Sequence, residues 1–120
     1  MPFASLLKEL VSSVEGAEGA IFLDSDGEAV QWFTTTSGER LCLRAAYVSV
    51  MLRACRDSAA RLKAGNISSL ILEYDGARFV VEELDRGYLL LLELRPSANI
   101  GQAIHRIQPA VASLRREIAA

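Results

Sequence analysis

The sequence predicts an α/β sandwich of the α+β type, in which helices cover both faces of a five-stranded antiparallel sheet. Two hairpin-like segments, at 19–33 and 67–94, place short apolar runs around Asp-Gly or Arg-Gly steps and supply the strands. Three segments with apolar residues at helical spacing, at 3–14, 41–64 and 97–118, supply the helices. With 120 residues, we expect a single domain, residues 1–120.

The first helix is indicated by apolar residues three and four positions apart, and it should end near Gly16, where a left-handed residue commonly follows a helix. These residues are Phe3, Leu6, Leu7, Leu10, Val11 and Val14. Only Met1 and Pro2 precede it, without the basic flank or long apolar run of a signal peptide. Apolar runs such as 88–92 are far shorter than the about 20 residues that span a bilayer. We therefore expect a cytoplasmic protein.

The next elements are a hairpin, a loop and a long helix. The runs Gly19–Asp24 and Ala29–Phe33 flank an Asp-Gly step, which predicts a hairpin closed by a type I′ turn. The polar stretch Thr34–Gly38 is a loop that leads to a helix over Leu41–Ala64. That helix should end at Gly65-Asn66.

A three-stranded meander and a last helix complete the chain. The predicted strands are Ile67–Tyr74, Ala77–Leu84 and Tyr88–Leu94, joined at Asp75-Gly76 and Asp85-Arg86-Gly87. The last helix carries Ile100, Ile104, Ile107, Val111, Leu114 and Ile118 at helical spacing, with Ser97 or Asn99 as its cap. Pro109 removes one intrahelical hydrogen bond and should kink or divide this helix near Arg106.

The distribution of apolar residues predicts the order of the strands. Strands one and five are apolar on both faces, as strands in the middle of a sheet are, whereas the other three carry polar residues. With neighbours joined by hairpins, the simplest order is 2-1-5-4-3. The terminal helices then lie on one face and the long central helix on the other. The third strand becomes an edge.

The long helix has more apolar surface than its own sheet can cover. One stripe comprises Leu41, Ala45, Val48, Leu52, Cys55, Ala59 and Leu62. A second stripe, on a neighbouring side, comprises Leu43, Tyr47, Val50, Met51 and Ala54. The polar sector, which holds Ser49, Arg53, Arg56, Asp57 and Lys63, is narrow. The second stripe is either core beneath a loop or an interface with another chain, and we favour the interface.

The predicted edge strand supports the same interpretation, because an open edge with little charge is commonly paired with another chain. Helix and edge together predict a twofold homodimer, or a heterodimer with a paralogue, in which long helices pack and edge strands pair. The expected interface residues are Leu43, Tyr47, Val50, Met51, Ala54, Ser68, Leu70 and Leu72.

Charge gives a weaker prediction. The net charge of −2 provides no general attraction to nucleic acid or to an anionic membrane. Four arginines of the long helix are candidate contacts for an acidic partner surface: Arg44, Arg53, Arg56 and Arg61. The alternative is an ordinary solvated helix face, with Asp57 reducing its positive potential.

No enzyme, metal or cofactor site is predicted. Asp24, Asp26 and Glu28 resemble the start of a calcium loop, but Ala29 and Thr35 stand where that loop needs glycine and a bidentate carboxylate. The glycines form no phosphate-binding loop with a following Lys and Ser or Thr. The single histidine, His105, excludes a multi-histidine site and is expected at the surface. We therefore expect a non-enzymatic protein without cofactor.

The two cysteines are expected to be free thiols. Cys42 and Cys55 fall on one predicted helix, about 20 Å apart, which is too far for a disulfide within the chain. Cys55 should be a small buried hydrophobe on the core stripe, and Cys42 should be more accessible.

Several motifs in order resemble the Roadblock family, which includes dynein light chains and bacterial MglB-type regulators of Ras-like GTPases. They are the helix at 6–10, the segments Val14–Ala20 and Leu23–Glu28, and the start of the last helix at Ser97–Gly101. The resemblance covers essentially the whole chain and implies the profilin-like Roadblock fold. It also implies a homodimeric or heterodimeric platform that holds no nucleotide and that either binds a small GTPase or serves as a motor or signalling adaptor. In the bacterial members the partner is a Ras-like GTPase, and the dimer repositions its switch regions.

Three functions remain in competition. The first is a dimer that regulates a Ras-like GTPase, and the second is a structural adaptor of a motor or signalling complex that uses the same dimer. The third is a small-molecule sensor, with Trp32, Phe33 and Tyr74 lining a pocket. We rank the sensor last because no group of polar residues converges to orient a ligand.

Overall fold

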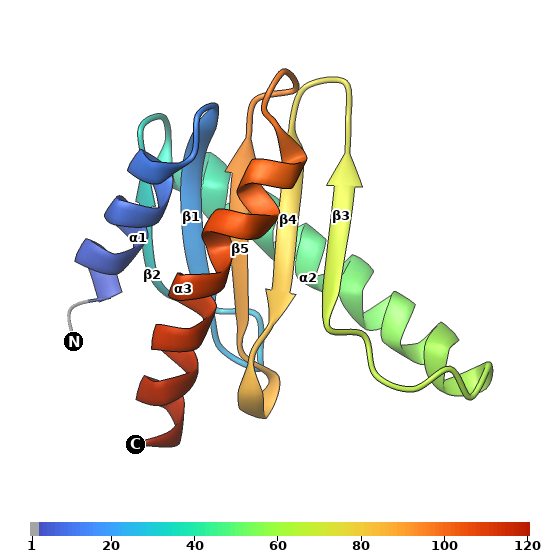
Figure 1. Ribbon diagram of the computed structural model, residues 1–120. Coiled ribbons are helices and arrows are strands. Elements are labelled where there is room, and N and C mark those ends of the chain that lie inside the picture. Colours follow the sequence, from blue (N-terminus) through green and yellow to red (C-terminus); the bar gives the residue numbers. More distant parts are fainter. Residues whose placement is uncertain (1–2) are drawn as a thin grey trace.

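The computed structural model describes residues 3–120, and it confirms the predicted sandwich (Figure 1). The elements are α1 (Phe3–Ser13), β1 (Ala17–Leu23), β2 (Ala29–Thr34), α2 (Gly38–Arg61), β3 (Ser69–Glu73), β4 (Arg78–Glu83), a 3-10 turn η1 (Asp85–Gly87), β5 (Leu89–Leu94) and α3 (Ile100–Ala119). The expectation about a leader at Met1 and Pro2 lies outside the described residues.

The sheet has the predicted order β2-β1-β5-β4-β3, and every neighbouring pair is antiparallel. As expected from their apolar sequences, β1 and β5 lie in the middle, and all six residues of β5 are buried. Helices α1 and α3 cover one face of the sheet and α2 crosses the other (Figure 1). The strands β2 and β3 are the two edges.

The core has two layers because side chains alternate between the faces of each strand. On β5, Leu90 and Leu92 pack in the layer beneath α1 and α3, and Leu89 and Leu91 pack in the layer beneath α2. The first layer also holds Leu7, Leu10, Phe22, Ile107 and Leu114. The second also holds Ile21, Leu41, Val48, Leu52 and Phe79. Two apolar faces of the sheet therefore explain why helices are needed on both sides.

The turn between β1 and β2 differs from the prediction. Gly27 has positive φ (82°) and Asp26 does not, so the hairpin does not close with a type I′ turn. Instead, Gly27 N–H donates to the Asp24 carbonyl at 3.0 Å, and the Asp24 side chain accepts from the backbone N–H groups of Asp26 and Glu28. The Asp24 carboxylate thus stabilises this longer turn, because it accepts from two backbone N–H groups within the turn.

The two positive φ angles of a type I′ turn occur instead at η1. Arg86 (φ 59°) and Gly87 (φ 80°) are its central residues, and Tyr88 N–H donates to the Asp85 carbonyl. Of the three hairpin turns in the sheet, the turn between β4 and β5 is therefore the one with two consecutive positive φ angles.

Helix α3 starts as predicted, with the Asn99 side chain accepting from Gln102 N–H at 3.0 Å. The helix is continuous from Ile100 to Ala119, so Pro109 does not divide it. The exposed position of Pro109 lets its ring lie outside the core while the buried stripe of α3 continues past it.

Helix α2 begins and ends three residues earlier than predicted, at Gly38 and Arg61. Ser37 caps its start by accepting from Arg40 N–H, and Lys63, with positive φ (55°), follows its end. Its last turns project past β3, beyond the edge of the sheet (Figure 1). This projection overturns part of the predicted core stripe, since Leu62 is 78% exposed.

Two more positions on α2 differ from expectation. Cys55 is half-buried rather than buried, because the layer beneath α2 includes the stripe residues from Leu41 to Leu52 but not Cys55. Ser49, placed in the polar sector, is buried, and its hydroxyl donates to the Ala46 carbonyl at 2.7 Å.

Candidate interaction surface on the long helix and the edge strand

The second apolar stripe of α2 is exposed. We call its residues, Leu43, Tyr47, Val50, Met51 and Ala54, the α2 face. The exposed fractions of the four large ones run from 37% at Met51 to 64% at Tyr47. From Leu41 to Leu52 the first stripe packs on the sheet, so the residues of the α2 face point to the other sides of the helix and are only partly covered within residues 3–120. Exposed apolar residues grouped in this way are typical of an interaction surface.

The edge strand β3 can contact another chain mainly through its backbone, because two of its predicted interface side chains are half-buried. Leu70 and Leu72 are half-buried and pack in the layer beneath α2, so both belong partly to the core of this chain. Ser68 precedes β3, and its carbonyl accepts from Glu83 N–H at 2.8 Å. Within residues 3–120, β3 pairs only with β4, so its other edge is open to a further strand.

The structure separates the four candidate arginines. Arg44 Nη1 lies 2.5 Å from Glu93 Oε2, and Arg56 Nη2 lies 2.8 Å from Glu83 Oε1 in an ion pair without hydrogen-bond geometry. Arg53 donates to the Asp26 carbonyl at 3.3 Å. Within residues 3–120, the Arg61 side chain makes no ion pair or hydrogen bond, and it is exposed. Two of the four arginines are thus engaged with carboxylates of the same chain.

Sequence reasoning missed Glu93, which is 2% exposed near the end of β5. Its strand position places it on the α2 side of the sheet, opposite Phe79 of β4 and Gly19 of β1. A signal was available, because a single carboxylate within the run LLLLEL needs a buried partner. The partner lies 49 residues earlier in the chain, on a different element.

A small cavity borders the α2 face at the turn between β3 and β4. It has a volume of about 190 Å³ and is lined mainly by apolar atoms of α2 and of that turn. Its lining comprises Arg44, Tyr47, Val48, Tyr74, Gly76, Ala77 and Phe79. The Tyr74 hydroxyl lies 3.8 Å from the Met51 sulfur, which connects this turn to the helix.

The pocket expected for a small-molecule sensor is not formed. Trp32 pairs with Ile21 and lies on the α2 side of β2, whereas Phe33 packs in the layer beneath α1 and α3. Tyr74 follows β3, at the opposite edge of the sheet. Neighbouring residues on a strand face opposite ways, so the three aromatic side chains do not meet.

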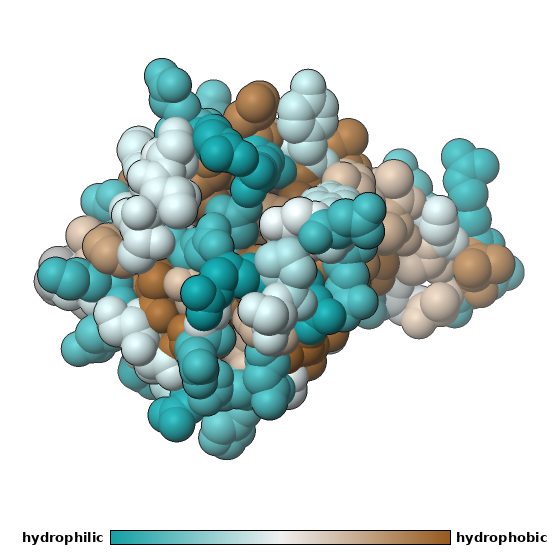
Figure 2. All heavy atoms as spheres, turned by 90° about the horizontal axis from the view of Figure 1, so that it is seen from above, coloured by the Kyte–Doolittle hydropathy of each residue, from teal (hydrophilic) through white to brown (hydrophobic). Residues whose placement is uncertain are grey.

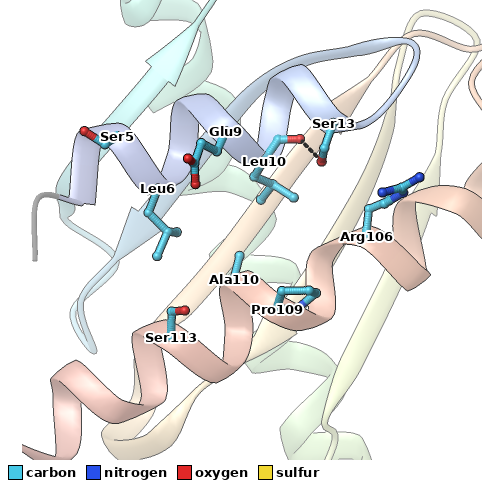
Figure 3. A pocket seen from close by; sticks show the side chains of 9 residues that line it. All are labelled: Ser5, Leu6, Glu9, Leu10, Ser13, Arg106, Pro109, Ala110 and Ser113. Atoms are coloured by element: carbon cyan, nitrogen blue, oxygen red, sulfur yellow. Dashed lines mark hydrogen bonds between the residues drawn. The ribbon is translucent and has the colours of Figure 1, made fainter.

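A groove between α1 and α3 lies on the opposite face of the sheet (Figure 3). Its volume is about 380 Å³, and its apolar part is formed by Leu6, Leu10, Pro109 and Ala110. Glu9 extends from α1 and Arg106 from α3 at its two walls (Figure 3). None of the candidate interface residues borders it.

Both cysteines are free and half-buried, and burial raises the pKa of the Cys42 thiol above its ordinary value of 9.0. Cys42 packs against the layer beneath α2, so it is less accessible than its sequence position suggested. His105 is exposed on α3, as expected.

Within residues 3–120, no three His, Cys, Asp or Glu side chains are grouped as a metal site would require. None of the helices in this range has the length and hydropathy to cross a membrane.

Comparisons with known proteins identify the same architecture elsewhere. The family model described as the Roadblock/LC7 domain matches residues 3–93. A Roadblock/LC7 domain from Streptomyces avermitilis is 20% identical, with a TM-score of 0.87 and 97% of each chain covered.

Two further solved structures are similar. MglC from Myxococcus xanthus is 27% identical, with a TM-score of 0.69, 98% of this chain and 99% of that chain covered. An MglB with a tetrameric arrangement is 20% identical, with a TM-score of 0.82, 93% of this chain and 84% of that chain covered. A comparison with curated protein sequences finds no match.

Proposed function

Because the chain belongs to the Roadblock/LC7 domain family, we propose that it is a dimeric, non-enzymatic platform that binds and regulates a Ras-like small GTPase. The observation that carries this proposal is the exposed α2 face beside the open edge of β3. A second copy of the chain would cover both features at once.

The dimer is supported by the character of the two features. An apolar helix face gains free energy when it is removed from water, at about 25 cal/mol per Å² of apolar surface. A strand edge gains hydrogen bonds when it pairs with an identical edge across a twofold axis. The tetrameric arrangement of a structurally similar MglB shows that this fold also occurs in a self-associated form.

A regulatory role without catalysis fits the residues of the chain. The sequence has no glycine-rich loop followed by Lys and Ser or Thr, so the chain itself is not expected to bind the nucleotide phosphates. Membership of the Roadblock/LC7 domain family supports a regulator or an adaptor rather than an enzyme. The GTPase would therefore supply the catalytic machinery. This protein would change the conformation of the GTPase or its rate of nucleotide exchange.

Arg53 and Arg61 are the better candidates for contacts with the GTPase. Arg44 and Arg56 already neutralise Glu93 and Glu83, so using them for a partner would break ion pairs within the chain. Arg61 lies on the projecting end of α2 with an exposed side chain. It is free to meet an acidic surface.

The experiment is affinity capture from the native lysate loaded with GDP or with a GTP analogue, followed by kinetics. We expect a Ras-like GTPase to be recovered, and its hydrolysis or exchange rate to change when the purified protein is added. The matched control is the Val50→Asp variant, which should be monomeric and should therefore not change the rate of the GTPase. Recovery of a motor or receptor component without a GTPase would contradict regulation and support the structural adaptor. An unchanged rate with a bound GTPase would do the same.

A further inference from the structure

The projecting end of α2 and the small cavity near Tyr74 lie at opposite ends of the exposed surface. We propose that they are complementary halves of one contact, in which Leu62 of a second copy occupies the cavity. This inference rests on the proposed dimer and adds the residues that fix its register. It follows from three observations, on geometry, on size and on charge.

Geometry brings the two features together. In Figure 1, α2 projects past the edge of the sheet near the start of β3, whereas the cavity lies at the turn that follows the end of β3. A twofold axis that pairs the two β3 strands antiparallel reverses the strand direction. The start of one β3 then lies beside the end of the other, so the projecting helix end of the second copy extends over the cavity.

Size and chemistry agree. Leu62 is 78% exposed and is the most exposed of the large hydrophobic residues in the described chain. The cavity, at about 190 Å³, is smaller than the roughly 300–1,000 Å³ of typical small-molecule sites. It suits one apolar side chain. Figure 2 shows the helix end as a separate projection with hydrophobic and hydrophilic surface together.

Charge selects a second copy as the occupant. The helix end carries Lys63 directly after Leu62. The turn beside the cavity carries Asp75, and Glu73 precedes that turn. The Glu73 side chain is 58% exposed, and its ion pair with Arg78 is long, with 3.7 Å between Glu73 Oε1 and Arg78 Nε. Each copy thus presents a basic end and an acidic rim, and a twofold dimer forms the pairing twice.

The test is disulfide trapping in the full chain with Cys42→Ala and Cys55→Ala. In this background, Leu62→Cys is combined with Gly76→Cys. A Cβ atom at Gly76 meets nothing within 4 Å, so the site accepts a side chain. We expect mild oxidation to give a covalent dimer, because a residue in the cavity brings the two Cα atoms to within about 4.4–6.8 Å. The matched control combines Leu62→Cys with Val30→Cys, on the far edge strand β2, and should not cross-link.

The outcomes separate the two proposals. A dimer in sedimentation equilibrium that does not cross-link through positions 62 and 76 overturns this contact but leaves the dimer intact. A monomer overturns the proposed dimer and the contact with it.

A second measurement does not depend on the packing at Leu62. Lys63→Glu should weaken the dimer about tenfold, because two weak exposed ion pairs become repulsive. Adding Asp75→Lys should restore the affinity, and absence of this rescue in a folded dimer contradicts the contact.

Discussion

Arg44 and Glu93 form an ion pair that joins α2 to the central strand β5, with Arg44 Nη1 2.5 Å from Glu93 Oε2. The carboxylate side chain is 3% exposed, while the arginine side chain is 39% exposed. Arg44 also lines the cavity beside the α2 face. The pair therefore positions the helix whose outer side we propose as the interface.

Arg44→Met should destabilise the fold, because it removes the partner of a buried carboxylate. We expect a loss of about 1–3 kcal/mol in the free energy of unfolding, at the low end of values for buried pairs because Arg44 is partly exposed. Urea denaturation measures this. Adding Glu93→Leu should recover most of the loss, since the double variant leaves no charge buried. If the double variant is less stable than Arg44→Met, the carboxylate has another stabilising contact.

Val50→Asp should convert the proposed dimer into a monomer at micromolar concentration. Val50 is 57% exposed on the α2 face, so the carboxylate is harmless in the single chain and costs several kcal/mol when desolvated in an interface. Light scattering measures the mass. Val30→Asp is the control, since Val30 is 43% exposed on the far edge strand and should leave the dimer unchanged. Equal masses for both variants would remove Val50 from the interface.

Gly16→Ala should destabilise the chain by roughly 1–3 kcal/mol, for reasons of both backbone and space. Gly16 has φ of 90°, and an added Cβ would lie 2.7 Å from Ala98 Cβ. Gly76→Ala is the matched control, because its φ is not positive and no atom lies within 4 Å of the added Cβ. Thermal unfolding compares the two variants. A similar melting temperature for both would show that the junction after α1 can rearrange.

Cys42 should react slowly with thiol reagents at neutral pH. Burial raises the pKa of its thiol above 9.0, so the reactive thiolate is scarcer in the folded chain than in the unfolded one. The raised pKa also means that this group's contribution to stability is complete below about pH 9 and is lost as the pH rises further. Labelling rates of Cys55→Ala, folded and in urea, measure the difference. Equal rates would contradict it.

The sequence by itself determined the elements and their order. Continuous apolar runs at 20–23 in β1 and 89–92 in β5 place these strands in the middle, because only a strand covered on both faces buries both sets of side chains. The hairpins then leave one simple arrangement for the remaining strands. Local spacing and strand pairing follow from the chain alone, so both were predictable.

The exposed α2 face was also predictable, because helical periodicity assigns each residue to a side of the helix. The depth of burial was not. Leu62 and Cys55 continue the core stripe of the sequence, yet the sheet ends before α2 does, and Leu62 is exposed. Periodicity describes direction around the helix axis, and only the width of the sheet decides how far along the helix cover extends.

The tertiary structure alone decided which charges are paired and which turn has which backbone. Arg44 and Glu93 are separated by 49 residues, so their contact follows from how α2 crosses the sheet, which no local pattern encodes. Asp26-Gly27 and Arg86-Gly87 both suit a tight turn, but the Asp24 carboxylate favours a different turn at the first of them. Long-range contacts and competing hydrogen bonds depend on the assembled fold, so the sequence pattern does not predict them.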